Sequence, residues 1–426
     1  MYMLEAILDR RNVERALKQV ESNKGACGVD GMQVDELRPT LNAQWQSLRA
    51  SIMEGSYKPQ PVRKVEIPKP QGGTRMLGVP TVIDRLLQQC INQTLNPIYD
   101  AMFDNWSYGF RPKRNAHHAV LQAQSFLEQG YIWVVELDLA KFFDKVNHDK
   151  LMGLLMKTIE DKRVLKLIRS YLTAGIMEGG LVSQRTEGTP QGSPLSPLLS
   201  NVILNELDKE LRTRGHCFVR YADDCTIYVK SEKSAIRVAE SIIKYIEEEL
   251  KLQVNREKTR VGKASESSLL GYSFYNDKGR WQPRLSEKTK ERIKKKCKEA
   301  TRRNDGKSQE EQIKQLRAVI AGWVNYFILA KAKRVLERLD ELVRTRLRIG
   351  KWKNWKRPET RVRELMRLGV SKPQAYMWGN SSKGHCRLAH SPILLRTLNN
   401  GYWRSEGYKG FVETYRERKE LQTSFF

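Results

Sequence analysis

Apolar side chains recur along this chain with two different periods, and the period changes several times before residue 284. In some stretches they repeat every three to four residues, as on one face of a helix. In others, β-branched and aromatic residues form short runs bounded by turn residues, which predicts strands. We expect helices within residues 1–60, at 85–95, 151–172 (as a pair) and 235–250, and strands at 62–80 (as a hairpin), 131–138 and 218–229. This mixture predicts an α+β fold.

From about residue 284 the pattern is helical and strongly basic. Residues 284–426 contain 36 Lys and Arg against 15 Asp and Glu, so this third carries +21 of the whole chain's net charge of +27. Tryptophans alternate with lysines at 351–357, and Trp323 lies in an apolar stripe. Interleaved cations and aromatic rings can neutralise phosphates and stack on bases. The last third therefore predicts nucleic-acid binding, with a plain basic surface and a core role for Trp323 as the alternatives.

Carboxylates stand at the ends of two predicted strands. The run 218–229 has a polar centre, Asp223-Asp224, too short for anything but a tight turn, so a hairpin with two carboxylates at its tip is expected. Alone, such a pair usually marks a solvated turn. The strand 131–138, however, ends in Asp138, and together the three carboxylates suit two Mg²⁺ ions about 3.5–4 Å apart, with Mn²⁺ as an alternative. Such a cluster is typical of nucleotidyl transfer.

Several segments, in order, resemble the characteristic blocks of reverse transcriptases. Tyr221 to Asp224 resembles their Tyr-x-Asp-Asp box, and Asp138 with 142–144 resembles their first catalytic block. The segment 190–201 is similar to the block between these two. The order and spacing resemble those of bacterial group II intron reverse transcriptases, or maturases, over most of the chain. Ser193 departs from the Gly more usual in that family.

This resemblance implies a right-hand polymerase whose palm contains an antiparallel sheet. It implies an N-terminal extension and fingers at 1–130, a palm at 131–283, an α-helical thumb (the maturase domain X) at 284–360, and a small basic C-terminal helical domain at 361–426. After residue 360 there is neither a pair of Cys-x-x-Cys motifs nor a His-Asn-His arrangement. The chain thus resembles the short form of the family, which lacks the endonuclease domain.

The resemblance also implies roles for individual residues. Asp138, Asp223 and Asp224 would be catalytic and would bind the metal ions. Phe142 would lie under the nucleotide sugar and exclude a 2′-hydroxyl, although alternation makes one of Phe142 and Phe143 a core residue. The remaining residues expected to bind the nucleotide are Lys69, Arg75, Gln191 and Lys258. Those expected to bind nucleic acid are Asn23, Gly25, Arg111, Lys113, Arg114, Gly192, Arg344, Arg346, Arg348, Lys351 and Lys353.

The implied activity is that of an RNA-directed DNA polymerase that also binds its intron RNA, assisting splicing and intron mobility by target-primed reverse transcription. Its partners would be an RNA template, a DNA primer, dNTPs, group II intron RNA and target DNA, and it would act as a monomer or a homodimer. Two alternatives stay open: a domesticated group II-like reverse transcriptase in DNA repair or defence, and a mainly non-catalytic RNA-binding splicing cofactor.

Composition excludes other classes of protein. No apolar run reaches the length of a membrane span, and the N-terminus lacks the pattern of a secretion signal. The six cysteines have no paired spacing, which speaks against both a disulfide framework and a zinc site. We therefore expect a cytoplasmic protein without a membrane partner.

Overall fold

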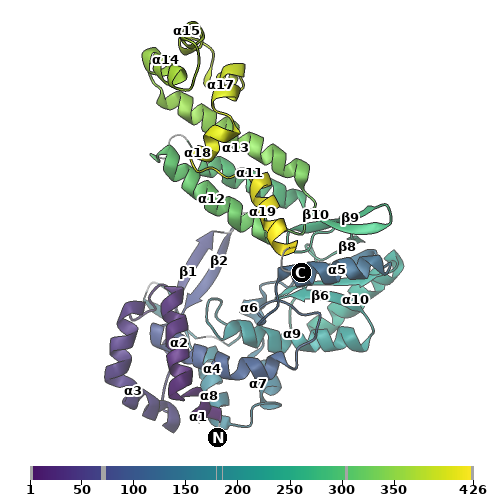
Figure 1. Cartoon of the computed structure of the whole chain (residues 1–426). Helices are drawn as coiled ribbons and strands as arrows, with labels where there is room; N and C mark the ends of the chain where they lie inside the picture. Colours follow the sequence, from purple (N-terminus) through teal and green to yellow (C-terminus); the bar gives the residue numbers. More distant parts are fainter. Residues whose placement is uncertain (1–2, 69–72, 179, 185, 303–305, 424–426) are drawn as a thin grey trace. The chain divides into compact units, whose positions relative to one another are not determined.

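The chain divides into two compact units, Met1–Ser267 and Ser268–Phe426 (Figure 1). The computed structural model describes residues 3–68, 73–178, 180–184, 186–302 and 306–423. The hairpin that follows residue 268 is thereby grouped with the C-terminal helices. The four-part division at 130, 283 and 360 stays a prediction.

Unit 1 contains two sheets and a set of helices. Its helices are α1 (Met3–Ile7), α2 (Arg10–Asn23), the 3₁₀ turn η1 (Val34–Glu36), α3 (Leu37–Glu54), α4 (Val82–Asp100), α5 (Ala116–Glu128), α6 (Phe142–Lys145), α7 (His148–Met156), α8 (Lys162–Thr173), α9 (Ser196–Thr213) and α10 (Glu232–Glu248). Its strands are β1 (Val62–Pro68), β2 (Thr74–Val79), β3 (Trp133–Leu137), β4 (Ile176–Glu178), β5 (Leu181–Ser183), β6 (Cys217–Tyr221), β7 (Asp224–Val229) and β8 (Arg260–Lys263). The predicted helices and strands are all present.

Local chemistry accounts for where several of these helices begin and end. The residues that precede α4, α5 and α10 are Thr81, Asn115 and Ser231. The side chain of each accepts a hydrogen bond from the backbone amide three residues later. Such caps satisfy amides that have no partner within the helix. Helix α3 ends at Gly55, whose φ of 74° lies in the left-handed region that glycine adopts without strain.

The central sheet of unit 1 has the strand order β6-β7-β3-β8, and every neighbouring pair is antiparallel. Val135 of β3 pairs with Ile227 of β7, and both side chains are fully buried in the core. Helix α10 packs against β3, β7 and β8, and α5 and α9 pack against β6. The strands predicted at 131–138 and 218–229 are therefore confirmed as neighbours in one sheet.

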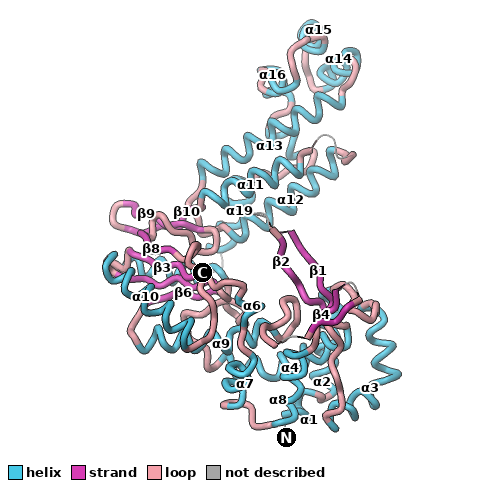
Figure 2. The backbone as a smooth tube through the Cα atoms, turned by 180° about the vertical axis from the view of Figure 1, so that it is seen from behind, coloured by secondary structure: helices cyan, strands magenta, loops and turns pink. Residues whose placement is uncertain are grey.

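A second sheet of unit 1 has the order β2-β1-β4-β5, and Figure 2 labels its strands β2, β1 and β4. The antiparallel hairpin β1–β2 was expected, and its register joins Arg63 to Val79 and Pro68 to Thr74. Strand β4 runs parallel to β1, an arrangement that the short segment 176–183 did not indicate. The hairpin therefore belongs to a larger sheet.

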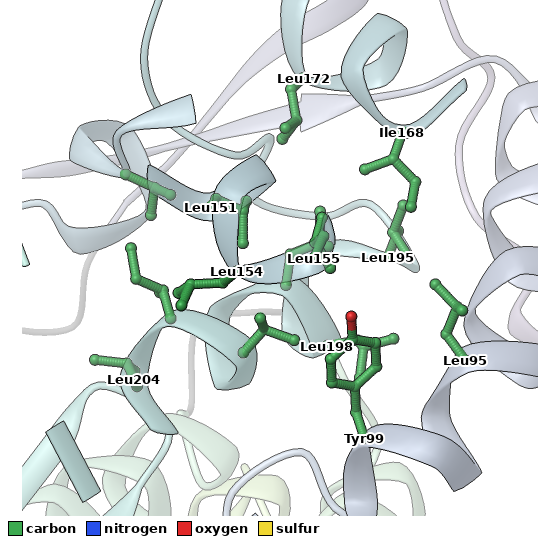
Figure 3. Close-up of a cluster of buried hydrophobic side chains, with 14 of the residues drawn as sticks. Leu95, Tyr99, Leu151, Leu154, Leu155, Ile168, Leu172, Leu195, Leu198 and Leu204 are labelled. Atoms are coloured by element: carbon green, nitrogen blue, oxygen red, sulfur yellow. The ribbon is translucent and has the colours of Figure 1, made fainter. Parts of the chain in front are cut away.

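Four helices of unit 1 enclose a dense apolar cluster (Figure 3). Tyr99 comes from α4, Leu151 and Leu155 from α7, Ile168 from α8 and Leu198 from α9, and all are buried. Buried side chains of this kind supply most of the free energy that holds such helices together. The helix pair predicted at 151–172 is confirmed as α7 and α8.

Unit 2 is a hairpin followed by helices. Its strands are β9 (Tyr272–Asp277) and β10 (Arg280–Leu285), and its helices are α11 (Glu287–Ala300), α12 (Gln309–Tyr326), α13 (Lys333–Asn354), α14 (Pro358–Arg367), α15 (Lys372–Gly379), α16 (His385–Ala389), α17 (Pro392–Thr397), α18 (Asn400–Ser405) and α19 (Phe411–Thr423). No helix among the described residues is long and apolar enough to cross a membrane. All six cysteines are free thiols, as expected.

The last helix of unit 2 is attached to α13 through one buried carboxylate. Asp340 accepts hydrogen bonds from the backbone amides of Phe411 and Val412 at 2.7 and 3.1 Å and from the Tyr408 hydroxyl at 3.1 Å. A Cβ atom on Gly410 would lie 2.5 Å from this carboxylate, so only glycine permits the approach. The first amides of α19 have no partner within that helix, and Asp340 of α13 accepts their hydrogen bonds.

Replacing Asp340 by Asn should detach α19. Asn offers one acceptor where three donors converge, and a buried donor left without a partner costs about 1–3 kcal/mol. We expect a lower urea midpoint and faster hydrogen exchange at residues 411–421. The matched control is Glu341→Gln, which removes the same charge from an exposed neighbour and should change neither measurement. Unchanged exchange at 411–421 in Asp340→Asn would contradict this account of the docking.

Candidate active site

Strand register brings the three predicted carboxylates to one edge of the central sheet. The last pair of the β3–β7 ladder joins Leu137 to Cys225, so Asp138 and Asp224 are the residues that come next at the same edge. The last pair of the β6–β7 ladder joins Tyr221 to Asp224, which leaves Ala222 and Asp223 as the turn. The hairpin predicted at 218–229 and the placement of its two carboxylates at the tip are therefore confirmed.

The carboxylates at this edge interact electrostatically. The pKa of Asp224 is raised to about 6, first by partial burial and then by the charges of Asp223, Asp138 and Glu136. More than a third of the residue nevertheless remains exposed. The Lys258 ammonium lies 3.7 Å from the Asp138 carboxylate. Both partners are substantially exposed, so this ion pair contributes little to stability.

These residues fit a divalent cation by their chemistry. Carboxylate oxygens are the ligands that Mg²⁺ prefers, and burial, together with the charges of Asp223 and Asp138, raises the pKa of Asp224. Among the described residues, no three His, Cys, Asp or Glu side chains stand together in the geometry of a finished metal site. Carboxylates that have no cation between them repel each other, which favours side-chain positions farther apart than in a metal site.

A cavity of about 680 Å³ in unit 1 gathers many of the predicted binding residues. Asn23, the last residue of α2, and Gly25 lie on its wall, as do Arg75 of β2 and the loop residues Gln191 and Gly192. The Arg75 Nε donates a 2.7 Å hydrogen bond to the Gln191 side-chain oxygen. The structure therefore brings together segments that are far apart in the sequence. Lys69 lies outside the described residues.

The assignment of Phe142 to the nucleotide site is wrong. Phe142 is 3% exposed in the core, whereas its neighbour Phe143 is half-buried and lines the cavity. The strand ends at Leu137, and Lys141 adopts a left-handed φ of 48° before helix α6 begins at Phe142. Alternation along the strand therefore does not extend to these rings.

Arg111 is also misassigned, because it lies inside the protein. Its guanidinium is 3% exposed and donates to the Asp100 carboxylate at 2.6 Å and to the backbone carbonyls of Asp100, Asp104 and Ser107. Four of its five N–H groups are thus used within the protein, and burial keeps the side chain away from a phosphate. Lys113 of the same segment is exposed, and Arg114 donates to Asn105 from a half-buried position.

The predicted basic surface of unit 2 is only partly a surface. Arg348 is 6% exposed and donates to the carbonyls of Leu398 and Ala389. Arg346 donates to carbonyls at the end of α11. Trp352 and Trp355 are buried and contact each other, so neither can stack on a base. These expectations are corrected for Arg348, Trp352 and Trp355, which build the interior of unit 2, whereas Arg346 is half-buried and its contact with nucleic acid stays a prediction.

Three cations of the same stretch keep accessible positions. Lys353 is exposed, and Arg344 is half-buried on the wall of a separate cavity of about 240 Å³. Lys351 lies 3.8 Å from Glu406 and over the ring of Tyr402. On a helix, residues 348 and 352 share one face, whereas 353 is turned about 100° away from 352. Helical phase therefore separates the buried residues from the exposed ones.

Sequence reasoning missed most residues of the cavity wall, and three of those missed are aromatic or cationic. Phe143 was passed over for its neighbour, and Arg85 was assigned only to a helix. Phe110 is 50% exposed, with a φ of 59° that a bulky residue rarely adopts. No sequence signal marks such a backbone conformation at a phenylalanine. For Arg85, a charge at an otherwise buried helical position was the available signal.

Comparison with known proteins defines the family. The family model described as reverse transcriptase (RNA-dependent DNA polymerase) matches residues 67–274, and the model described as the group II intron maturase-specific domain matches residues 290–369. This chain therefore belongs to the reverse transcriptase family, and the predicted α+β right-hand polymerase class is confirmed. More particularly, it belongs to the group II intron reverse transcriptases and maturases. Reverse transcriptase domains require a divalent metal ion and bind nucleic acid.

Curated relatives agree with this family. Protein YkfC of Escherichia coli (strain K12) is 32% identical over 320 residues, which are 66% of this chain and 84% of YkfC. The group II intron-encoded protein LtrA of Lactococcus lactis subsp. cremoris is 30% identical over 325 residues, 61% of this chain and 54% of LtrA. The chain thus spans most of YkfC but only about half the length of LtrA.

Solved structures give weaker likenesses. A telomerase from Candida albicans is similar over 83% of this chain and 64% of its own, with 12% identity and a TM-score of 0.44. A partial Cas6-RT-Cas1–Cas2 complex is similar over 58% of this chain and 43% of its own, with 25% identity and a TM-score of 0.38. Scores this low define no relationship by themselves.

Replacing Asp223 by Asn should lower the pKa of Asp224. The Asp223 charge is among the causes that raise this pKa, so its removal makes ionisation of Asp224 easier. The pKa of Asp224 can be measured by ¹³C NMR of labelled aspartate without divalent ions. Asp149→Asn, an exposed change in the same unit, is the control and should leave the pKa near 6. An Asp224 pKa that stays at about 6 in Asp223→Asn would contradict the carboxylate coupling.

Proposed function

We propose that this chain is an active RNA-directed DNA polymerase in which Asp138, Asp223 and Asp224 hold two Mg²⁺ ions. The observation that carries the proposal is the strand register that gathers these three carboxylates at one sheet edge. When bound, two such ions ease deprotonation of the attacking primer hydroxyl and stabilise the charge of the leaving pyrophosphate. The charges of Asp223 and Asp138 add to burial in raising the pKa of Asp224, and a cation beside these carboxylates would relieve their repulsion.

The cavity residues supply the nucleotide contacts in this proposal. Arg75, oriented by its bond to Gln191, provides a cation for a triphosphate, whose charge grows as pyrophosphate leaves. Lys69 and Lys258 are proposed as further cations, the latter because it already stands beside Asp138. Phe143 takes the place first given to Phe142, as the ring that excludes a 2′-hydroxyl.

Nucleic acid is proposed to lie along both units. In unit 1, Asn23, Gly25 and Gly192 line the cavity, and the exposed Lys113 and the half-buried Arg114 are proposed as further contacts. In unit 2, the proposed contacts are the accessible cations Arg344, Lys351 and Lys353 within a strongly basic third of the chain. Binding of intron RNA to assist splicing, and of target DNA for intron mobility, are proposed from the family.

The function is tested with Asp223→Asn. This change removes one metal ligand and no phosphate contact, so primer extension on an RNA template should be lost while binding of template–primer and of folded intron-type RNA stays within about twofold. Asp149→Asn is the matched control and should extend normally. Extension by Asp223→Asn at the wild-type rate would overturn the proposal, and loss of RNA binding would mean that the hairpin is structural only.

The ring that selects the sugar is tested with paired variants. Phe143→Ala opens the cavity wall, so the ratio of ribonucleotide to deoxyribonucleotide incorporation should rise. Phe142→Ala instead leaves a hole in the core, which should lower the free energy of unfolding by about 3–5 kcal/mol without changing that ratio. Primer extension with single nucleotides and urea unfolding measure the two effects. A ratio that responds to Phe142→Ala and not to Phe143→Ala would reverse the assignment.

A further inference from the structure

We propose that Arg220 is a positioning residue for this reaction, and that its buried guanidinium sets the place of the turn Ala222–Asp223 against the segment 108–110. The metal-binding edge and one wall of the nucleotide cavity would then be held in register by a single side chain. This inference rests on the proposed function, because it concerns the geometry of Asp223.

The first element of the argument is a fully buried ion pair. The Arg220 and Asp208 side chains are both 0% exposed, and the guanidinium meets the carboxylate with two bonds, Nε to Oδ1 at 2.7 Å and Nη2 to Oδ2 at 2.6 Å. Burial raises the pKa of Asp208, while the charge of Arg220 lowers it. A buried ion pair is often no more stabilising than apolar residues of the same volume, so stability alone does not account for its place under the hairpin.

The third nitrogen of this guanidinium reaches the catalytic turn. Arg220 Nη1 donates to the backbone carbonyl of Ala222 at 2.9 Å and to the Asn201 side-chain oxygen at 2.9 Å. The Ala222 carbonyl belongs to the peptide bond that leads directly into Asp223. Ala222 has a φ of 58°, a left-handed conformation that costs a non-glycine residue roughly 1–2 kcal/mol. The hydrogen bond from Arg220 opposes relaxation of this strained turn.

The segment 106–109 is hydrogen-bonded to the strand that leads into this turn. The backbone of Arg220 accepts a hydrogen bond from the Tyr108 amide at 2.9 Å and donates one to the Trp106 carbonyl at 3.0 Å. The Asn201 amide group donates to the Gly109 carbonyl at 2.9 Å, so Asn201 joins the guanidinium to this segment.

Gly109 lies directly against the turn. A Cβ atom at this position would be 2.2 Å from the Ala222 backbone nitrogen. The other atoms nearest to it also belong to the backbone of Tyr221 and Ala222, which cannot swing aside as a side chain can. The next residue, Phe110, lines the cavity. A displacement of the turn is therefore also a displacement of the cavity wall.

Lysine cannot replace this guanidinium. The planar guanidinium of Arg220 donates hydrogen bonds to Asp208, Asn201 and Ala222 at once. The lysine side chain is shorter and ends in a single ammonium group, which cannot reach all of these acceptors in the same geometry. The turn should then relax and move Asp223. Mg²⁺ demands near-ideal octahedral geometry, and a misplacement of about 1 Å can cost on the order of 100-fold in rate. Arg75 and Gln191, the proposed triphosphate contacts, belong to β2 and to the loop before α9 rather than to this network, so triphosphate binding should be kept although the wall at Phe110 shifts.

The experiment uses the whole chain carrying Arg220→Lys. The expected result is a kcat lowered by roughly 100-fold with KM for dNTP within about threefold of the wild type. Mn²⁺ affinity, measured by titration of the free-ion EPR signal without nucleotide, should fall about tenfold. RNA binding should be unchanged. Arg348→Lys is the matched control, because it removes another buried guanidinium, which donates to the carbonyls of Leu398 and Ala389 in unit 2. This variant should leave kcat and Mn²⁺ affinity unchanged.

A second variant keeps the test valid where Arg220→Lys does not fold. Gly109→Ala leaves the ion pair intact and presses on the Ala222 nitrogen, so it should give the same loss of kcat and of Mn²⁺ affinity. Wild-type kcat and Mn²⁺ affinity in a folded Arg220→Lys or in Gly109→Ala would overturn the inference. The Mn²⁺ titration requires no catalysis. A wild-type chain that binds Mn²⁺ through Asp223 but makes no DNA would therefore contradict the proposed function and leave the positioning role standing.

Discussion

The register between β3 and β7 is the constraint on which the rest of the candidate site depends. It is set by the apolar side chains that these strands bury, such as Val135 opposite Ile227. Because successive residues of a strand face opposite sides, a slip of one residue would turn these side chains out of the core. The same register makes Asp138 and Asp224 neighbours at the sheet edge. Core packing thus holds together charges that repel each other.

Burial and this repulsion together raise the pKa of Asp224, and the structure around the site offsets the repulsion. Below the hairpin, the Arg220–Asp208 pair carries hydrogen bonds to the turn, and beside it Lys258 approaches Asp138. Such sites, which concentrate like charges on rigid elements, are arranged to receive cations. The fold therefore accepts a local electrostatic cost where the family's chemistry requires a metal.

Charge counts in this protein overstate how much of its cationic surface is free for nucleic acid. Arg111, Arg220 and Arg348 are all buried and donate their hydrogen bonds to groups within the protein. Arginine suits this role because its planar fork can satisfy several acceptors at once. The basic composition still indicates a nucleic-acid partner, but the residues that meet phosphates are those that helical phase leaves outside, such as Lys353.

The sequence by itself determined the helices, the two hairpins, the carboxylate positions and the family, because periodicity, turn residues and motif spacing are local properties. Only the tertiary structure decided that Phe143 lines the cavity and Phe142 the core, since the left-handed backbone of Lys141 resets the phase between strand and helix. It also decided that Arg111 and Trp352 are interior. Burial depends on which distant segments pack against a residue, and a pattern within one segment does not contain that information.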